Sequence, residues 1–130
     1  MTWTIGELAR TIGIKIETIR YYEREGLMPV PPRTQTGRRS YGPSDLKTLS
    51  FIRKARELGF NLEDTRALLE LRSPDSECAD VKAIALKHLE IVRGQKARII
   101  EVEKILSDAI ARCPGGSTIN CSLLRVLEST

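Results

Sequence analysis

The sequence predicts a mainly α-helical fold in which a winged helix-turn-helix is followed by one long helix. Two short helical segments meet at Gly13, and a segment rich in proline and glycine spans residues 27–41. Residues 79–112 contain no proline and repeat apolar positions at helical spacing. These observations predict the class of the fold, and local signals in the sequence predict where each element begins and ends.

The composition is that of an ordinary folded protein, with 29% charged and 41% hydrophobic residues. No apolar run approaches the roughly 18 residues of a membrane span, and "MTWTIGELAR" lacks the layout of a signal peptide. We therefore expect a cytoplasmic protein without a membrane partner. A disulfide framework is not favoured, because three cysteines would leave one unpaired and the cytoplasm keeps thiols reduced. No nucleophile–base pair or phosphate loop is visible, so we do not expect an enzyme.

The first helix begins with a capping box, in which Thr4 and Glu7 each bond the other's backbone amide. Gly13 follows at a turn. A second helix runs from about Lys15 and stops at Gly26, a C-terminal glycine signal. Two short helices joined by a glycine-containing turn form a helix-turn-helix.

The segment 27–41 cannot be helical, because it contains Pro29, Pro31, Pro32 and Gly37. It is predicted to form a small wing, two short extended pieces around the turn "TQTG". Pro43 opens a third helix that Gly59 closes, and Asn61 caps a fourth. Residues 72–78 form a loop by composition.

The long helix carries a heptad seam, an apolar stripe at alternating steps of three and four residues. The seam consists of Ala85, His88, Val92, Gln95, Ile99, Val102, Leu106, Ala109 and Cys113. About 34 residues give a helix of about 50 Å, with no partner segment in its own chain. The seam therefore predicts a homodimer; the alternative is a helix folded back on its own domain. His88 is interpreted as a packing residue rather than a metal ligand.

The net charge of +4 is concentrated in the first half, where residues 1–72 hold 13 Lys and Arg against 9 Asp and Glu. Seven basic residues lie in one basic cluster that contains a single acid, Asp45: Arg33, Arg38, Arg39, Lys47, Arg53, Lys54 and Arg56. Such a cluster is the footprint of a polyanion site, although a solvated basic face has the same composition.

In a helix-turn-helix the second helix enters the major groove of DNA. Its polar side here comprises Lys15, Glu17, Thr18, Arg20 and Tyr21. Four further residues are suited to contact phosphates. Three lie on the wing, Arg38, Arg39 and Tyr41, and the fourth is Arg53 of the next helix. Phosphate contacts position a protein on DNA without carrying sequence information.

The stretches "TIGELAR", "ETIRYYEREGLMP" and "RRSYGPSDLKTLSFIRKARELGFNLEDTRALL" closely resemble the MerR family of transcriptional regulators, and the resemblance covers essentially the whole chain. It implies a dimer with an antiparallel coiled coil, bound to a pseudo-palindromic promoter with an overlong spacer. The effector-bound dimer bends and untwists the double-stranded DNA so that RNA polymerase can open it. The resemblance implies that four residues read or flank base edges: Lys15, Thr18, Arg20 and Tyr21. It also implies that four residues contact phosphates: Arg38, Arg39, Tyr41 and Arg53.

Cys78 and Cys113 flank the long helix and would lie about 50 Å apart within one chain. In an antiparallel dimer, Cys78 of one subunit meets Cys113 and Cys121 of the partner. Three thiolates select soft cations such as Hg²⁺, Cd²⁺, Pb²⁺ and Zn²⁺, and two thiolates suit Cu(I). We therefore predict a metal site between chains, against the alternative that the cysteines only pack as small apolar residues.

The resemblance narrows the choice of metal. Copper-sensing relatives keep only the two loop cysteines, whereas the mercury, cadmium, lead and zinc branches carry an upstream cysteine, as Cys78 does here. Some zinc sensors have a further cysteine where this chain has Pro114. We expect a divalent thiophilic ion, with Hg²⁺, Cd²⁺ and Pb²⁺ ahead of Zn²⁺. The alternatives are a Cu(I) sensor, or a redox sensor that joins Cys113 to Cys121.

The predicted domains are a winged helix-turn-helix DNA-binding domain over 1–72, a linker loop and dimerisation helix over 73–112, and a metal-binding loop with a short helix over 113–130. A multidrug-type relative is not favoured, because the large additional domain of that branch is absent from this sequence and aromatic residues make up only 5%.

Overall fold

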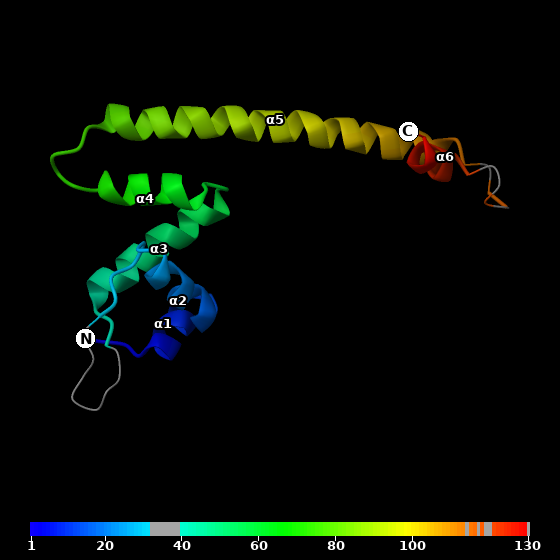
Figure 1. Ribbon diagram of the computed structural model, residues 1–130. Coiled ribbons are helices and arrows are strands. Elements are labelled where there is room, and N and C mark those ends of the chain that lie inside the picture. The colour runs from blue at the N-terminus through cyan, green and yellow to red at the C-terminus, as the bar shows by residue number, and fades with distance from the viewer. Residues whose placement is uncertain (32–39, 114, 117, 119–120, 130) are drawn as a thin grey trace. The chain divides into compact units, whose positions relative to one another are not determined.

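The computed structural model describes residues 1–31, 40–113, 115–116, 118 and 121–129 (Figure 1). Over these residues the chain forms six helices and no strand. The helices are α1 (Ile5–Ile12), α2 (Ile16–Arg24), α3 (Pro43–Glu57), α4 (Leu62–Glu70), α5 (Cys78–Ala111) and α6 (Ser122–Glu128). The predicted mainly α-helical class is confirmed. None of the helices described is long and apolar enough to cross a membrane.

The capping box of α1 is formed as the sequence predicts. The Glu7 amide donates to Thr4 Oγ1 over 3.1 Å, and the Thr4 amide donates to Glu7 Oε1 over 3.0 Å. At the other end, Gly13 takes a left-handed conformation with φ of 84° and donates its amide to the Ala9 carbonyl over 2.8 Å. Since a side chain at residue 13 would be strained at this φ, the glycine defines the turn between α1 and α2.

The predicted wing is described only at its two flanks. Its turn "TQTG" and the phosphate candidates Arg38 and Arg39 lie outside the described residues. On the C-terminal flank, Tyr41 forms an isolated antiparallel bridge with Trp3, with N–O distances of 2.7 and 2.9 Å. This bridge joins the start of the chain to the last residue of the predicted wing segment.

The main core lies where α1, α2 and α3 meet. Leu8, Ile19, Leu49 and Ile52 from these helices are fully buried there, together with Tyr41. Burying an aliphatic side chain of this size contributes about 1.5–3 kcal/mol. The core therefore holds the helix-turn-helix against the longer α3.

A second, smaller cluster joins α3 and α4. Ala55, Phe60 and Leu68 are buried in it, and Ile84 from the first turns of α5 packs against them. The helix α4 begins at its Asn61 cap, whose Oδ1 accepts from the Asp64 amide over 2.7 Å. The start of α5 is therefore packed on the same helices that support the helix-turn-helix.

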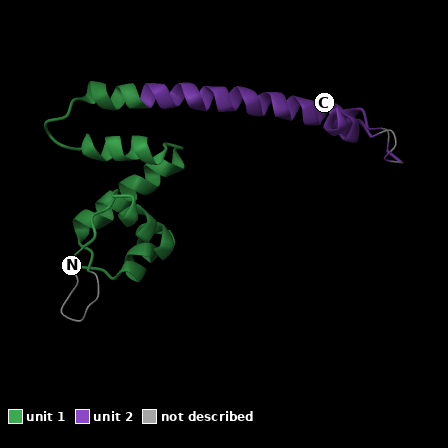
Figure 2. Ribbon diagram, in the orientation of Figure 1, with its two compact units in different colours: residues 1–84 green, residues 85–130 purple. Residues whose placement is uncertain are grey.

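The chain divides into two compact units, Met1–Ile84 and Ala85–Thr130, and the division falls inside α5 (Figure 2). The continuous α5 has 34 residues, close to the helix expected from the heptad seam. The predicted domains 1–72, 73–112 and 113–130 were defined by function rather than by internal contacts, and they stay a prediction.

The capping box makes part of the stability depend on pH. The backbone amide of Thr4, its hydroxyl and the nearby Arg10 hold the pKa of Glu7 below its ordinary value of 4.5. Because folding lowers the pKa of Glu7, the ionised carboxylate stabilises the folded state. This stabilisation is fully present above pH 4.5 and is lost as the pH falls through the lower pKa of the folded state.

We therefore expect Glu7→Gln to have a smaller fall in Tm than the wild type as the pH drops below 4.5. Thermal unfolding followed by circular dichroism at several pH values measures this difference. The exposed Glu101 gives the matched control, Glu101→Gln, which should follow the wild type. Parallel curves for Glu7→Gln and the wild type would contradict the prediction.

Candidate DNA-binding surface and metal-binding cysteines

The four residues predicted to read base edges lie on or beside α2: Lys15, Thr18, Arg20 and Tyr21. Lys15 is the N-cap, and its side chain is exposed without a capping hydrogen bond. Arg20 and Tyr21 are exposed, and Thr18 is half-buried. On the opposite side of the helix Ile19 is fully buried. Among the described residues this face of α2 is largely exposed and can meet a ligand, and its base contacts stay a prediction.

Tyr21 has a neighbour that the sequence reasoning missed. The Arg24 guanidinium carbon lies 5.9 Å from the centre of the Tyr21 ring. The signal was present in the sequence, because residues three apart on a helix lie on the same face. A cation over an aromatic face is attractive and limits the movement of the ring.

Tyr41 occupies the core rather than the surface. Its side chain is fully buried, and its hydroxyl donates to Glu23 Oε2 over 3.0 Å. Glu23 is itself buried near the end of α2. The predicted phosphate contact of Tyr41 needs a different side-chain position from this one, because the hydroxyl here is used to hold α2.

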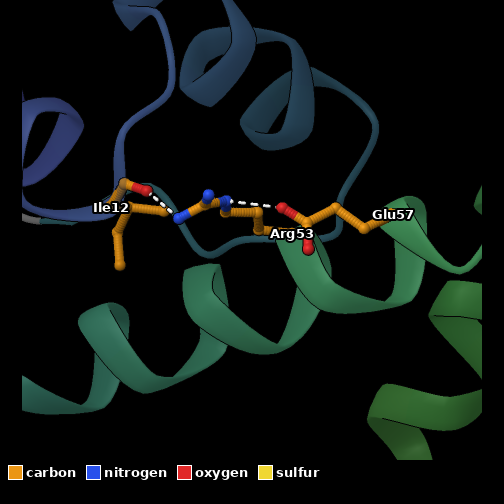
Figure 3. Close-up of polar contacts among 3 residues, drawn as sticks. All are labelled: Ile12, Arg53 and Glu57. Atoms are coloured by element: carbon orange, nitrogen blue, oxygen red, sulfur yellow. Dashed lines mark hydrogen bonds and ion pairs between the residues drawn. The ribbon is translucent and has the colours of Figure 1, made fainter.

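Arg53 joins α3 to the end of α1 (Figure 3). Its Nη1 donates to the carbonyl of Ile12, the last residue of α1, and its Nε donates to Glu57 Oε1 over 2.9 Å. A Cβ at Gly13 would lie 3.7 Å from Nη1, an ordinary van der Waals contact, so the positive φ rather than space is what favours glycine there. The Arg53 side chain is 46% exposed. It therefore supports the turn, while its predicted phosphate contact stays a prediction.

Other arginines of the first unit also bond within the chain. Arg66 Nη2 donates to the Glu25 carbonyl over 2.5 Å, and Arg56 Nη1 donates to the Phe60 carbonyl over 2.9 Å. Arg72 Nη2 donates to Thr48 Oγ1 over 3.0 Å. Counting basic residues could not reveal these roles, because the sequence does not say which guanidinium meets a backbone carbonyl.

The three cysteines flank α5 and precede α6. Cys78 is the first residue of α5 and is exposed, and Cys113 is exposed two residues after the last. Cys121 is half-buried at the N-cap of α6, and its amide donates to the Thr118 carbonyl over 3.1 Å. All three are free thiols. Over the residues that the structure describes, a single chain gathers no set of three His, Cys, Asp or Glu side chains for a metal.

The loop after α5 contains two consecutive glycines in the left-handed region, Gly115 and Gly116, with φ of 82° and 77°. Residues other than glycine rarely adopt this backbone conformation. The pair therefore bends the backbone between Cys113 and Cys121. The histidine of the heptad seam, His88, is 9% exposed and thus buried.

Comparison with known proteins identifies relatives over most of the chain. Residues 3–71 match the family described as "MerR HTH family regulatory protein", and residues 46–109 match "MerR, DNA binding". Heavy metal-dependent transcription regulator 2 of Rhizobium meliloti (strain 1021) is 38% identical over 96% of this chain and 86% of that protein. The mercuric resistance operon regulatory protein of Bacillus cereus is 36% identical over 98% of both chains.

A similar solved structure is that of the transcription regulator PbrR691 from Ralstonia metallidurans CH34 in complex with lead(II). It matches this chain with a TM-score of 0.78 and 33% identity, over 96% of this chain and 98% of that chain. The likeness extends through the long helix to the cysteine-containing end.

We predict that Tyr41→Phe lowers the free energy of unfolding by about 1–3 kcal/mol, because the buried Glu23 carboxylate loses a hydrogen-bond donor. Urea denaturation measures the change. The control Tyr21→Phe alters an exposed tyrosine and should cost less than about 0.5 kcal/mol. A Tyr41→Phe variant as stable as the wild type but weaker on DNA would instead favour the phosphate contact.

Proposed function

The chain belongs to the MerR family of helix-turn-helix regulatory proteins, and we propose that it is a homodimeric, metal-responsive regulator of transcription. It binds a pseudo-palindromic promoter and senses a divalent thiophilic ion through three cysteines shared between subunits. The observation that carries the proposal is the position of these cysteines: Cys78 begins α5, and Cys113 and Cys121 follow its end.

The DNA-binding part of the proposal rests on α2 and on the basic residues near it. The helix offers Arg20 and Tyr21 to the major groove from its exposed face. Arg38, Arg39 and Arg53 are proposed to contact phosphates, which supply affinity that falls with salt. The proposal thus separates base reading by α2 from positioning by the wing and α3.

The dimer is supported by the apolar surface of α5. Large apolar side chains of this helix are more than one third exposed in the single chain: Val81, Leu86, Leu89, Ile91, Val92, Ile99, Ile100, Val102, Ile105, Leu106 and Ile110. A contiguous apolar surface of this kind marks an interface in a folded protein. A second copy of α5 presents the same seam, so an antiparallel pair buries both.

The antiparallel arrangement supports a metal site in which Cys78 of one subunit joins Cys113 and Cys121 of the other. Three thiolates suit Hg²⁺, Cd²⁺, Pb²⁺ and Zn²⁺. We place Zn²⁺ behind the other three because this chain has Pro114 where some zinc sensors of the family have a further cysteine. The names of the mercuric resistance regulator and of the lead(II) complex agree with this class of ion. Metal binding is proposed to favour the dimer shape that bends and untwists the promoter for RNA polymerase.

Two arginine variants separate base reading from phosphate contact. Arg20→Ala should lose discrimination between operator and random DNA, because Arg20 faces the bases. Arg39→Ala should weaken both DNAs alike and reduce the slope of log affinity against log salt by about one unit. Fluorescence anisotropy over a salt series measures both effects. Full operator preference in Arg20→Ala would mean that α2 has been assigned the wrong role.

The shared metal site is tested with cysteine variants under reducing conditions. Cys78→Ser and Cys113→Ser homodimers should each fail to respond to Hg²⁺, Cd²⁺ or Pb²⁺ in transcription in vitro. A heterodimer with one change in each subunit keeps one intact site. It should therefore bind about half the wild-type amount of metal, read from thiolate-to-metal absorption. DNA binding should survive in all of these variants.

Different outcomes identify the alternatives. A site within one chain leaves the heterodimer with no intact site, so no tight binding would remain. A redox switch, or a Cu(I) sensor that uses only Cys113 and Cys121, leaves Cys78→Ser responsive to oxidant or copper. Each result would overturn the three-thiolate site between subunits.

A further inference from the structure

The reading helix α2 is short and needs support from other elements. It has only nine residues, and isolated helices of this length are marginal in water. Its buried hydrophobic side chains, Ile19 and Tyr22, fix the face that turns toward the core. The direction of the helix axis also depends on what holds its two ends.

The C-terminal end of α2 is held by a guanidinium from α4. The last carbonyls of any helix lack partners within it and carry partial negative charge. Here the carbonyl of Glu25, the C-cap residue, accepts from Arg66 Nη2 over 2.5 Å. The acceptor belongs to the backbone, so this bond constrains the helix itself rather than one of its side chains.

The base of the Arg66 side chain is anchored on both sides along α4. Thr65 is fully buried, and its hydroxyl donates to the Asn61 carbonyl over 2.8 Å. Leu68 is buried in the cluster that also takes in Ile84 of α5. Because its flanking residues are fixed, Arg66 can transmit the position of α4 to the end of α2.

We infer that Arg66 is a positioning residue for DNA recognition: it fixes the end of α2 relative to α4 and so sets the angle at which Arg20 and Tyr21 meet the bases. The inference rests on the proposed DNA binding. Arg66 is half-buried, lies outside the basic cluster and donates an N–H of Nη2 to a backbone oxygen. It acts through α2 rather than by touching DNA.

The test compares Arg66→Met with Arg66→Lys in the full-length protein. Methionine keeps much of the apolar stem but removes the charge and the donors, whereas lysine keeps the charge without the planar fork. Lys104→Met is the matched control, because Lys104 is exposed on α5 and loses the same charge. The probes are the duplex that the wild type selects from a random library and an unselected duplex of equal length.

Arg66→Met should bind the selected duplex about tenfold more weakly, the size expected for a lost charged hydrogen bond. Binding to the unselected duplex should stay within about twofold, and the salt slope should not change, because no phosphate contact is lost. Arg66→Lys should lie between Arg66→Met and the wild type, and Lys104→Met should match the wild type.

Two results would overturn the inference. If both duplexes weaken alike and the salt slope falls by about one unit, Arg66 contacts phosphate instead. If Arg66→Met binds both duplexes as the wild type does, the bond does not position α2. If Arg66→Met fails to fold, as judged by Trp3 fluorescence, Arg66→Lys alone provides the test. A loss of affinity for the selected duplex only supports the inference. An equal loss for both duplexes, or no loss, refutes it.

A wild type that selects no preferred sequence would refute the proposed DNA reading, not the role of Arg66 in holding α2. Amide hydrogen exchange then tests the clamp without DNA. Faster exchange at Glu25 and Gly26 in Arg66→Met supports the clamp, because the amides of both residues bond to carbonyls within α2. Unchanged protection at these amides refutes it.

Discussion

The apolar surface of α5 is the constraint on which the proposed assembly depends. A helix of 34 residues exposes aliphatic side chains along most of its length in a single chain. Water makes such exposure unfavourable, by about 25 cal/mol for each square ångström left uncovered. In the dimer that we propose, a second α5 would cover this surface, and an antiparallel pairing would bring the two ends of the helix together. The proposed dimer and the proposed shared thiolate site therefore follow from one physical requirement.

Some basic residues of the first unit bond within the chain, a role that a count of charges does not reveal. Arg53 and Arg66 each donate to a carbonyl at the end of a helix, one at Ile12 and one at Glu25. These bonds complement the partial negative charge of the two helix ends and tie both helices of the helix-turn-helix to α3 and α4. Positive charge in the first unit thus contributes to the shape of the helix-turn-helix, besides the attraction for phosphates that we propose.

Local signals in the sequence predicted the helices well. The capping box at Thr4, the turn at Gly13 and the cap at Asn61 each depend on neighbours within a few residues, and all three formed as expected. Contacts between distant residues were not predictable in this way. Tyr41 pairs with Trp3 and Glu23, and Arg66 with Glu25, and no spacing rule encodes such pairs. The cysteine site that we propose draws on a second chain, so one sequence supplies its donors but not their geometry.

The position of Ile84 within α5 restricts how this helix can change during evolution. Ile84 packs on α3 and α4, and the heptad seam continues in the same uninterrupted helix. One inserted residue rotates everything beyond it by about 100° and moves the seam out of phase with Ile84. Insertions or deletions of seven residues nearly restore the phase, whereas a single one does not. Lineages that lengthen or shorten α5 should therefore do so in whole heptads, and a chimera joined within this helix would have to respect the same periodicity.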